Sequence, residues 1–370
     1  MGSGKIAIFM QDLAGGGAER VMVQLAGGMV EQGQDVDLVL VRPEGPYLSM
    51  VPSEVRIMDL GTRRTLWSIP PLARYLRRER PAALLAALVH VNIAAILAAR
   101  LAGCGTHVVV SEHNQISRNA ANFSNPAIWF AHRLVPRLYP WASNIVAVSR
   151  GVADDLARFS GLPTDRIDVV YNPVVTPELH RMASERVDHP WFVGDEPPVI
   201  LGVGRLTAQK DFTTLIRAFV EVRRQRPARL VILGEGPRRQ ELEQMIGEFG
   251  LQGDVDLPGF AQNPYALMAS ASLFALSSAW EGLPTVLVEA MACGTPVVAT
   301  DCPSGPAEIL EKGRFGPLVP VGDHVALAQA IVQTLSSPLD AERLRRRAGD
   351  FSVERSVAQY KSILFAEPNR

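Results

Sequence analysis

The chain has 370 residues, of which 47% are hydrophobic and 20% are charged. This composition supports the packed cores of two or three domains and excludes an intrinsically disordered protein. The formal net charge of −1 gives no overall attraction to nucleic acid, which we do not expect as a partner. Three widely spaced cysteines form neither a disulfide framework nor a CxxC metal site, which fits a reducing compartment. The first residues do not show the pattern of a signal peptide.

Short apolar runs alternate with helical patterns in the first half of the chain. Strands are predicted at residues 6–10, 36–41, 83–88, 107–112, 144–148 and 168–171. A helix is predicted at 18–32, directly after three consecutive glycines, and is expected to end near Gly33. Because the predicted strands are apolar on both faces, we expect a parallel sheet that is covered by helices on each side.

A stretch without formal charge at 82–99 has nearly the length of a membrane span. It is mostly alanine and carries His90 and Asn92 in its middle, and both features disfavour membrane insertion. We therefore predict a buried strand, a loop that contains His90, and a helix at 92–101 that ends at Gly103. A transmembrane helix is the alternative.

A second series of strands is predicted at 199–203, 230–233, 255–257, 273–276 and 297–299. The segment between the two series, 172–198, contains five prolines and is the best candidate for a linker, with a short helix at 180–187 as the alternative within it. The predicted fold is α/β, with two doubly wound, Rossmann-like domains that face a central cleft. The expected division is an N-terminal domain at 1–175, a linker at 176–198, a C-terminal domain at 199–350 and a final segment at 351–370.

The segment 204–210, Gly-Arg-Leu-Thr-Ala-Gln-Lys, connects a predicted strand to a predicted helix. Arg205 and Lys210 therefore lie at the carboxyl end of a strand and beside a helix N-terminus, where two cations suit a diphosphate. Lysine occurs only four times in the chain, so a lysine in this loop indicates a need for a flexible ammonium group. An ordinary solvated loop is the alternative.

Two glutamates follow the strand predicted at 273–276. Glu281 lies in the next loop, and Glu289 lies about one turn into a helix that begins near Pro284. Carboxylates accept pairs of hydroxyl groups, and the backbone N–H groups at a helix N-terminus bind anions, so the segment predicts a ligand with both sugar and phosphate. An exposed helical position is the alternative for Glu289, but its neighbours are apolar and predict burial.

Taken together, these motifs resemble the retaining glycosyltransferases of family 4, which have the GT-B fold and transfer a sugar from a nucleotide-sugar. The resemblance rests on the Glu-x7-Glu pair of Glu281 and Glu289, the Gly-Arg-Leu-x3-Lys of 204–210, and the segments at 15–20, 233–237 and 301–308. It covers nearly the whole chain, with the motifs in the order of the family.

The resemblance implies a role for each motif residue. Arg205 and Lys210 would bind the donor diphosphate, Glu289 the ribose hydroxyls and Glu281 the transferred sugar. The further donor-binding positions would be Gly16, Gly17, Gly204, Phe260 at the base, Gly282, Leu283, Pro284 and Thr285. The resemblance also implies a C-terminal helix that crosses back to the first domain. Its buried face would consist of Phe351, Val357, Tyr360 and Leu364.

His113 follows the strand predicted at 107–112, at a position where family members often carry a histidine that hydrogen-bonds the donor sugar. We expect the catalytic residues to be His113, Glu281, Arg205 and Lys210. We expect acceptor contacts from Gly15, Gly16, His113 and Asn114. A structural hydrogen bond in a loop is the alternative for His113, and Glu112 is expected to orient its neighbours.

Two Asp-x-Asp triplets, at 35–37 and 254–256, match a motif that holds a metal in other glycosyltransferases. Each leads into a strand and therefore lies at the end of the sheet away from the ligands. We expect no metal site, no essential metal and no other cofactor. The triple glycine is not followed by the GxGxxG pattern of dinucleotide-binding proteins.

The expected reaction is retaining transfer of a sugar from a nucleotide-sugar, such as a UDP-hexose or a UDP-N-acetylhexosamine, to a lipid-linked or envelope-glycan acceptor. One alternative is a glycosyltransferase with a soluble small-molecule acceptor. The others are a sugar-nucleotide epimerase or hydrolase of the same fold and a non-catalytic nucleotide-sugar-binding protein.

Basic side chains concentrate in two segments of the first half. Residues 63–80 contain six arginines and one glutamate, and residues 118–141 interleave arginines with aromatic side chains. These are Arg118, Arg133 and Arg137 with Trp129, Phe130, Tyr139 and Trp141. Such patterns favour an anionic membrane surface, so we expect a cytoplasmic enzyme that binds peripherally to the inner face of the cytoplasmic membrane. A solvated basic face with ordinary core aromatics is the alternative.

Overall fold

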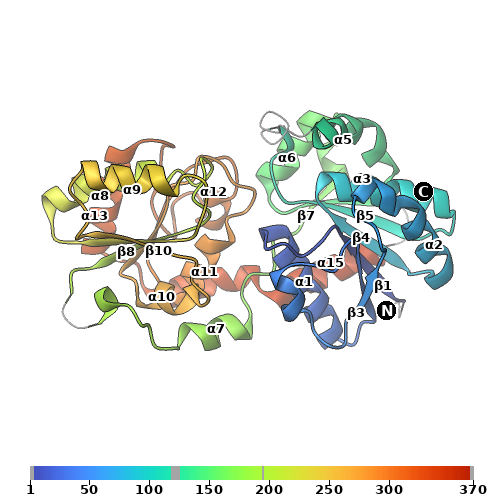
Figure 1. The fold of residues 1–370 in the computed structure, drawn as a ribbon, viewed down its shortest axis with the longest axis horizontal. Coiled ribbons are helices and arrows are strands. Elements are labelled where there is room, and N and C mark those ends of the chain that lie inside the picture. The colour runs from blue at the N-terminus through green and yellow to red at the C-terminus, as the bar shows by residue number, and fades with distance from the viewer. Residues whose placement is uncertain (1–3, 118–125, 194–195, 367–370) are drawn as a thin grey trace. The chain divides into compact units, whose positions relative to one another are not determined.

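The computed structural model describes residues 4–117, 126–193 and 196–366, and the chain forms two compact units (Figure 1). Unit 1 comprises Met1–Pro173 and Val353–Arg370, and unit 2 comprises Val174–Ser352. The segment 176–198, predicted as a linker, is therefore part of unit 2. Its helix α7 (Pro177–Ala183) is fixed there by Asn263, whose Nδ2 donates a hydrogen bond of 2.9 Å to the carbonyl oxygen of Met182.

Unit 1 contains a parallel sheet with strand order β3-β2-β1-β4-β5-β6-β7. The strands are β1 (Ile6–Met10), β2 (Val36–Leu40), β3 (Arg56–Asp59), β4 (Ala83–Ala87), β5 (His107–Glu112), β6 (Asn144–Ala147) and β7 (Ile167–Val169). The helices are α1 (Gly17–Glu31), α2 (Ile69–Glu79), α3 (Val89–Ala102), α5 (Pro126–Leu138), α6 (Arg150–Ser160) and α15 (Val353–Leu364). Six of these strands were predicted. The edge strand β3 was not, because its four residues are mostly exposed.

Helices cover both faces of this sheet, as its uniformly apolar strands predict (Figure 1). Ile6, Ile8 and Met10 of β1 pack with α1 and α15 on one face, whereas Ala7 and Phe9 pack with α2 and α3 on the other. Helix α15 contributes Val353, Val357, Tyr360 and Leu364 to the core of unit 1. Phe351 does not belong to this face, because it lies in the preceding 3-10 turn (Gly349–Phe351) of unit 2.

Helix α3 begins earlier than predicted, so His90 lies in its first turn and not in a loop. Leu88, just before the helix, has φ +78° and ψ 135°, a conformation that costs a non-glycine residue about 1–3 kcal/mol. This turn directs the chain from β4 into α3. Within the described ranges, no helix combines the length and the hydropathy that a membrane span requires.

Unit 2 contains a parallel sheet with strand order β10-β9-β8-β11-β12-β13. The strands are β8 (Val199–Val203), β9 (Arg229–Leu233), β10 (Val255–Gly259), β11 (Leu273–Leu276), β12 (Val297–Thr300) and β13 (Leu318–Val319). The helices after α7 are α8 (Phe212–Gln225), α9 (Arg239–Glu248), α10 (Pro264–Ser270), α11 (Thr285–Cys293), α12 (Pro306–Ile309), α13 (His324–Ser336) and α14 (Ala341–Ala348). Helices α8, α9 and α13 cover one face of the sheet, and α10 and α11 lie on the other (Figure 1).

Each sheet has one topological switch point, where the strand order reverses. It lies between β1 and β4 in unit 1 and between β8 and β11 in unit 2. In open α/β sheets, ligands bind at the carboxyl ends of the strands on either side of such a point. The loops after these four strands are therefore where a functional site is expected.

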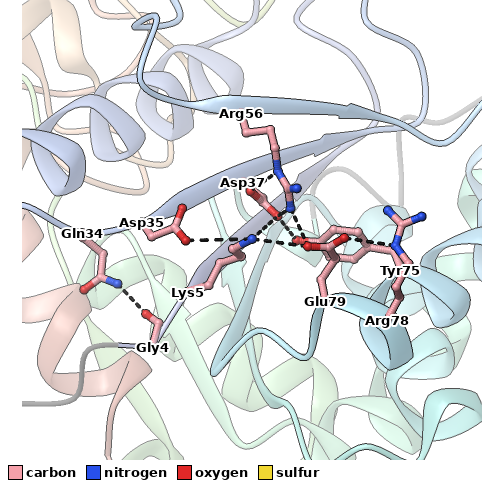
Figure 2. A network of polar contacts seen from close by, with 9 residues as sticks. All are labelled: Gly4, Lys5, Gln34, Asp35, Asp37, Arg56, Tyr75, Arg78 and Glu79. Atoms are coloured by element: carbon pink, nitrogen blue, oxygen red, sulfur yellow. Dashed lines mark hydrogen bonds and ion pairs between the residues drawn. The ribbon is translucent and has the colours of Figure 1, made fainter.

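The Asp-x-Asp triplet at 35–37 lies at the opposite, amino-terminal end of the sheet in unit 1, within a network of charged side chains (Figure 2). Asp37 is fully buried and accepts hydrogen bonds from Arg56 Nε (2.8 Å) and from the Tyr75 hydroxyl (2.6 Å). Lys5 Nζ lies 3.6 Å from Asp37 and 3.3 Å from Glu79. Although burial opposes it, these partners hold the pKa of Asp37 below its ordinary value.

The second triplet, at 254–256, has protein partners of the same kind. Asp254 accepts hydrogen bonds from Arg223 Nε (2.9 Å) and Arg229 Nη1 (2.5 Å). Asp256 lies 3.0 Å from His189 Nε2. Both triplets are at the amino ends of strands, as predicted, and their carboxylates contact basic side chains of their own unit.

Candidate active site

The loop after β8 carries the two predicted cations. The Arg205 side chain is exposed and has no polar partner in the described part of the chain, whereas Lys210 is largely buried. The loop is hydrogen-bonded to the segment 233–237, since Leu206 N donates to the carbonyl of Glu235 at 2.9 Å. Gly234 has φ +136°, and a Cβ there would lie 2.0 Å from the carbonyl oxygen of Gly204. Only glycine permits this close approach, which fixes the position of the cationic loop.

Lys210 and Glu281 form an ion pair at the switch point of unit 2. Lys210 Nζ lies 2.6 Å from Glu281 Oε1, and the two side chains are only 16% and 7% exposed. The Ser278 hydroxyl donates to the same carboxylate oxygen at 2.7 Å, and Gln209 Nε2 donates to Oε2 at 3.3 Å. The structure thus brings two predicted site residues together. It adds Gln209 and Ser278, which the sequence analysis missed. Their only signal was proximity in the sequence, since Gln209 precedes Lys210 and Ser278 lies three residues before Glu281.

The loop that carries Glu281 is held by the predicted segment 301–308. Glu281 N donates to the carbonyl of Pro303 at 2.8 Å, and Ser304 N donates back to the carbonyl of Glu281 at 2.9 Å. The Ser304 hydroxyl donates to the carbonyl of Gly282 at 2.9 Å. These hydrogen bonds fix the backbone of Glu281 and Gly282, so the segment 301–308 holds the loop that carries Glu281 in place.

Helix α11 begins directly after this loop, with Pro284 as its N-cap and no capping side chain. The first N–H groups of a helix have no intrahelical acceptor, and the helix dipole adds partial positive charge there. Gly282, Leu283, Pro284 and Thr285 therefore lie at or just before the amino end of α11, directly after Glu281 of the Lys210–Glu281 pair. Glu289 is buried in the second turn of α11, as predicted.

Phe260 is not part of this cluster. It follows β10, which is separated from β8 by β9, and its side chain is 80% exposed. An exposed phenylalanine at the carboxyl end of a strand offers a free aromatic face for stacking.

The switch point of unit 1 carries a second polar cluster. His90 Nε2 lies 3.0 Å from Gln11 Oε1, which also accepts a 2.9 Å hydrogen bond from the Thr65 hydroxyl. Asp12 pairs with Arg42 Nη2 at 2.5 Å. The sequence analysis placed His90 in a loop because the apolar stretch around it was divided about one turn too late. A histidine in the first turn of an alanine-rich helix was the available signal.

The three consecutive glycines at the start of α1 differ in their surroundings. Gly15 has φ +101°, which favours glycine, and a Cβ on Gly16, the N-cap of α1, would lie 2.3 Å from Glu19 Oε2. A Cβ on Gly17 would meet nothing within 4 Å. The space beside the Gly17 Cα is therefore open, and its role in ligand binding stays a prediction.

His113 follows β5 and is almost completely buried, while Asn114 beside it is half-buried. The His113 Nε2 atom lies 3.1 Å from the Ser111 hydroxyl oxygen, which in turn lies 3.1 Å from the Tyr360 hydroxyl of α15. Burial lowers the pKa of His113 to about 4. The imidazole is therefore neutral at neutral pH.

Glu112 is the last residue of β5, and its carboxylate has partners of its own. Its carboxylate accepts a 2.9 Å hydrogen bond from Asn92 Nδ2 and another from the Tyr139 hydroxyl. Burial raises the pKa of Glu112 to about 7, although both hydrogen bonds oppose this shift. Glu112 thus links β5 to α3 and to Tyr139 inside unit 1, and no hydrogen bond joins it to His113 among the described residues.

This raised pKa gives a testable pH dependence of stability. The folded protein binds the Glu112 proton more tightly than the unfolded chain does, so protonation of Glu112 stabilises the fold at low pH. This stabilisation is lost as the pH rises through about 7. We expect the difference in unfolding free energy between wild type and Glu112→Gln to change by about 2 kcal/mol between pH 5 and pH 8. His113 acts in the opposite direction but is present in both proteins. Urea denaturation at the two pH values measures the difference, and a pH-independent difference contradicts the expectation.

Two family models match this chain, one in each unit. Residues 15–177 match the family described as Glycosyltransferase Family 4. Residues 185–351 match the family described as Glycosyl transferases group 1.

Among curated relatives, one from Campylobacter jejuni is 30% identical over 352 residues, which cover 92% of each chain. It is an N-acetylgalactosamine-N,N'-diacetylbacillosaminyl-diphospho-undecaprenol 4-alpha-N-acetylgalactosaminyltransferase. Amylovoran biosynthesis glycosyltransferase AmsD from Erwinia amylovora is 26% identical over 358 residues, or 94% of this chain and 96% of AmsD.

Two solved structures share the architecture over nearly their full length. Alr3699/HepE from Anabaena, in complex with UDP, has a TM-score of 0.79 at 21% identity and covers 98% of this chain and 100% of its own. The lipopolysaccharide outer core galactosyltransferase WaaB has a TM-score of 0.75 at 19% identity, with 98% and 99% covered. At these identities the likeness shows the fold alone.

Proposed function

Because this chain belongs to glycosyltransferase family 4 and has the GT-B fold, we propose that it transfers a sugar from a UDP-sugar to a lipid-linked or envelope-glycan acceptor, with retention of anomeric configuration. Glycosyltransferase activity follows from the family. The donor, the stereochemistry, independence from metal and the membrane location are the proposed parts. The observation that carries the proposal is the largely buried Lys210–Glu281 pair at the switch point of unit 2, in the same loop as Arg205, which has no polar partner among the described residues.

The donor diphosphate is proposed to bind at this switch point. Arg205 and Lys210 supply two positive charges, and the N-terminus of α11 adds the partial charge of its dipole. Negative charge develops on the diphosphate as the glycosidic bond breaks, so groups fixed in advance around it lower the barrier. Phe260 would stack on the uracil, and the buried Glu289 would accept the ribose hydroxyls. UDP is the nucleotide bound in the Anabaena structure.

The surroundings of Glu281 support a role in binding the sugar. Oε1 already accepts hydrogen bonds from Lys210 and Ser278, and Oε2 accepts one from Gln209. A carboxylate held by three donors is a poor nucleophile and a well-oriented acceptor for sugar hydroxyl groups. We therefore propose that the acceptor hydroxyl attacks from the side of the leaving diphosphate, without a covalent intermediate.

Chelation tests the proposed independence from metal. If Arg205, Lys210 and the α11 terminus neutralise the leaving diphosphate, activity in EDTA stays close to the untreated value. A complete loss with EDTA, restored by manganese, contradicts this part of the proposal. The carboxylates of both Asp-x-Asp triplets would then be the first candidates to revisit.

The exposed side chains of residues 63–74 support an acceptor at a membrane surface. Trp67 and Leu66 are 70% and 62% exposed, and Arg63, Arg64 and Arg74 are exposed nearby along the chain. Exposed aromatic and basic side chains together favour the interface of an anionic bilayer. The names of two relatives contain undecaprenol linked through a diphosphate, a membrane lipid.

Other residues in the predicted basic segments have structural partners. Arg77 Nε donates to the carbonyl of Ala102 at 3.1 Å, and Arg78 pairs with Glu79 at 3.0 Å. Tyr139 is fully buried and is not available to a membrane. Phe130 is exposed, and so is Trp141, which lies 4.6 Å from the Arg100 guanidinium. Arg118 and the side chain of Trp129 lie outside the described residues.

Liposome flotation tests membrane binding. The wild type is expected to float with anionic vesicles and not with neutral ones, and replacing Arg63, Arg64 and Arg74 by glutamate is expected to abolish flotation. The matched control replaces Arg158, Arg217 and Arg346, which are also exposed, by glutamate with the same change in net charge. Equal loss in both variants indicates a net-charge effect. No preference for anionic vesicles, together with transfer to a water-soluble acceptor, favours the soluble-acceptor alternative.

Two assays in sequence test the function itself. Thermal-shift measurements across nucleotides and nucleotide-sugars are expected to show stabilisation by UDP and by one or more UDP-sugars. Radiolabelled transfer from the stabilising donors into lipid extracts then identifies the product. Sugar release or epimerisation without acceptor favours the hydrolase or epimerase alternative, and binding without any turnover favours a non-catalytic protein.

A further inference from the structure

A chain of buried hydroxyl groups ends at the imidazole of His113. The Tyr360 hydroxyl of α15 lies 3.1 Å from the Ser111 hydroxyl of β5, which lies 3.1 Å from His113 Nε2. Tyr360 and Ser111 are completely buried. None of these three residues belongs to the proposed donor site in unit 2. Their hydrogen bonds connect the C-terminal helix α15 to the end of β5.

The direction of these hydrogen bonds follows from the donors that must be satisfied. Within the described residues, Ser111 is the only hydrogen-bond partner of the Tyr360 hydroxyl. A buried donor left without an acceptor costs more than an acceptor that receives no hydrogen bond. Tyr360 therefore donates to the Ser111 oxygen. The single hydrogen of the Ser111 hydroxyl is then directed at His113 Nε2, which must accept it.

The reverse direction leaves a polar hydrogen unsatisfied. If His113 carried its proton on Nε2 and donated it to Ser111, the Ser111 hydroxyl would donate to Tyr360. The Tyr360 hydroxyl hydrogen would then have no acceptor in a fully buried environment. Burial also keeps the imidazole neutral, so His113 carries one ring proton and not two.

We propose that Ser111 is a positioning residue that holds His113 in the Nδ1–H tautomer, with Tyr360 fixing the direction of the Ser111 hydroxyl. His113 Nδ1 has no hydrogen-bond partner among the residues described, so its N–H is the group that His113 presents to a ligand. This part of the inference rests on the proposed function: the Nδ1–H group of His113 donates a hydrogen bond to an oxygen atom of the substrate. His113 is then a hydrogen-bond donor and not a general base.

The tautomer can be measured without substrate. In protein labelled with 15N-histidine, two-bond 15N–1H correlations at neutral pH distinguish the two tautomers, and His113→Gln assigns the signals by their disappearance. We expect Nδ1–H in the wild type and in Ser111→Thr, which keeps the hydroxyl. In Ser111→Ala we expect Nε2–H or a mixture. Nε2–H in the wild type overturns the proposal.

Activity and stability separate positioning from packing. Ser111→Ala leaves the Tyr360 hydroxyl unsatisfied and is expected to lose stability as well as about fivefold to tenfold in kcat. The double variant Ser111→Ala/Tyr360→Phe removes the unsatisfied hydroxyl, so it is expected to recover stability while kcat stays low. Ser111→Thr is expected to restore kcat. If kcat recovers together with stability in the double variant, Ser111 has only a structural role and the proposal fails.

The tautomer result and the transfer result can fail independently. An Nδ1–H signal in a protein that transfers no sugar contradicts the proposed function and leaves the assignment of the tautomer intact. An active transferase whose wild-type His113 is protonated on Nε2 contradicts the inference alone.

Discussion

Replacing Lys210 with methionine is expected to lower kcat/KM by a factor on the order of 100 to 1,000, because the change removes a charge-assisted contact to the leaving diphosphate. It also removes the ion pair that orients Glu281, whose carboxylate lies 2.6 Å from the ammonium group. Arg205→Ala removes the second, exposed cation and is expected to show a smaller loss without a change in stability. Arg217→Ala, an exposed position of α8, is the matched control with no expected loss.

A second variant separates the loss of catalysis from the loss of folding. Lys210→Met leaves a nearly buried carboxylate without its cation, which itself destabilises the protein. The double variant Lys210→Met/Glu281→Gln removes that uncompensated charge, so we expect stability to recover while activity does not. Steady-state kinetics with urea denaturation of the same preparations measures both. Near-normal turnover in both Lys210→Met and Arg205→Ala contradicts the diphosphate assignment.

Replacing Asp37 with alanine is expected to destabilise unit 1 by about 3–5 kcal/mol, the usual effect of removing one partner from a buried charge network. Arg56, Lys5 and Tyr75 all lose their common partner (Figure 2). The same triplet supplies the control. The Asp35 side chain is 67% exposed and lies 3.9 Å from Lys5, so Asp35→Ala is expected to cost no more than about 1 kcal/mol.

Urea denaturation of the two variants distinguishes a structural triplet from a metal site. A structural role predicts a large loss of stability for Asp37→Ala, a small one for Asp35→Ala, and full activity for Asp35→Ala. Similar small effects on stability, combined with a metal-dependent loss of activity in both variants, contradict the structural role.

The strands that could be predicted from the sequence are those with continuous apolar runs. The bounds of β1, β5, β8 and β11 agree with the prediction because both faces of these strands are buried. The edge strands β3 and β13 were missed, since an edge strand needs no such pattern and β13 has only two residues. The polar residues in the apolar stretch at 82–99 indicated correctly that it does not form a continuous membrane helix, but not that α3 begins at Val89.

The candidate site was predicted residue by residue but not as a set of contacts. Lys210 and Glu281 are 71 positions apart, and their ion pair depends on β8 and β11 being neighbours in the sheet. Strand order is set by packing of the whole unit and cannot be derived from either motif alone. For the same reason the sequence did not show that Arg77 caps α3 or that Tyr139 is buried against Glu112.

Retaining transfer from a UDP-sugar determines the anomeric configuration of the product, which can be measured. The transfer reaction is run with a stabilising UDP-α-sugar and a sugar linked to a polyprenyl diphosphate in detergent. 1H NMR then reports the coupling constant of the new anomeric proton. An α-linked product is expected as UDP is released. A β-linked product, or no glycoside from any UDP-sugar that binds, contradicts retaining transfer from a UDP-sugar.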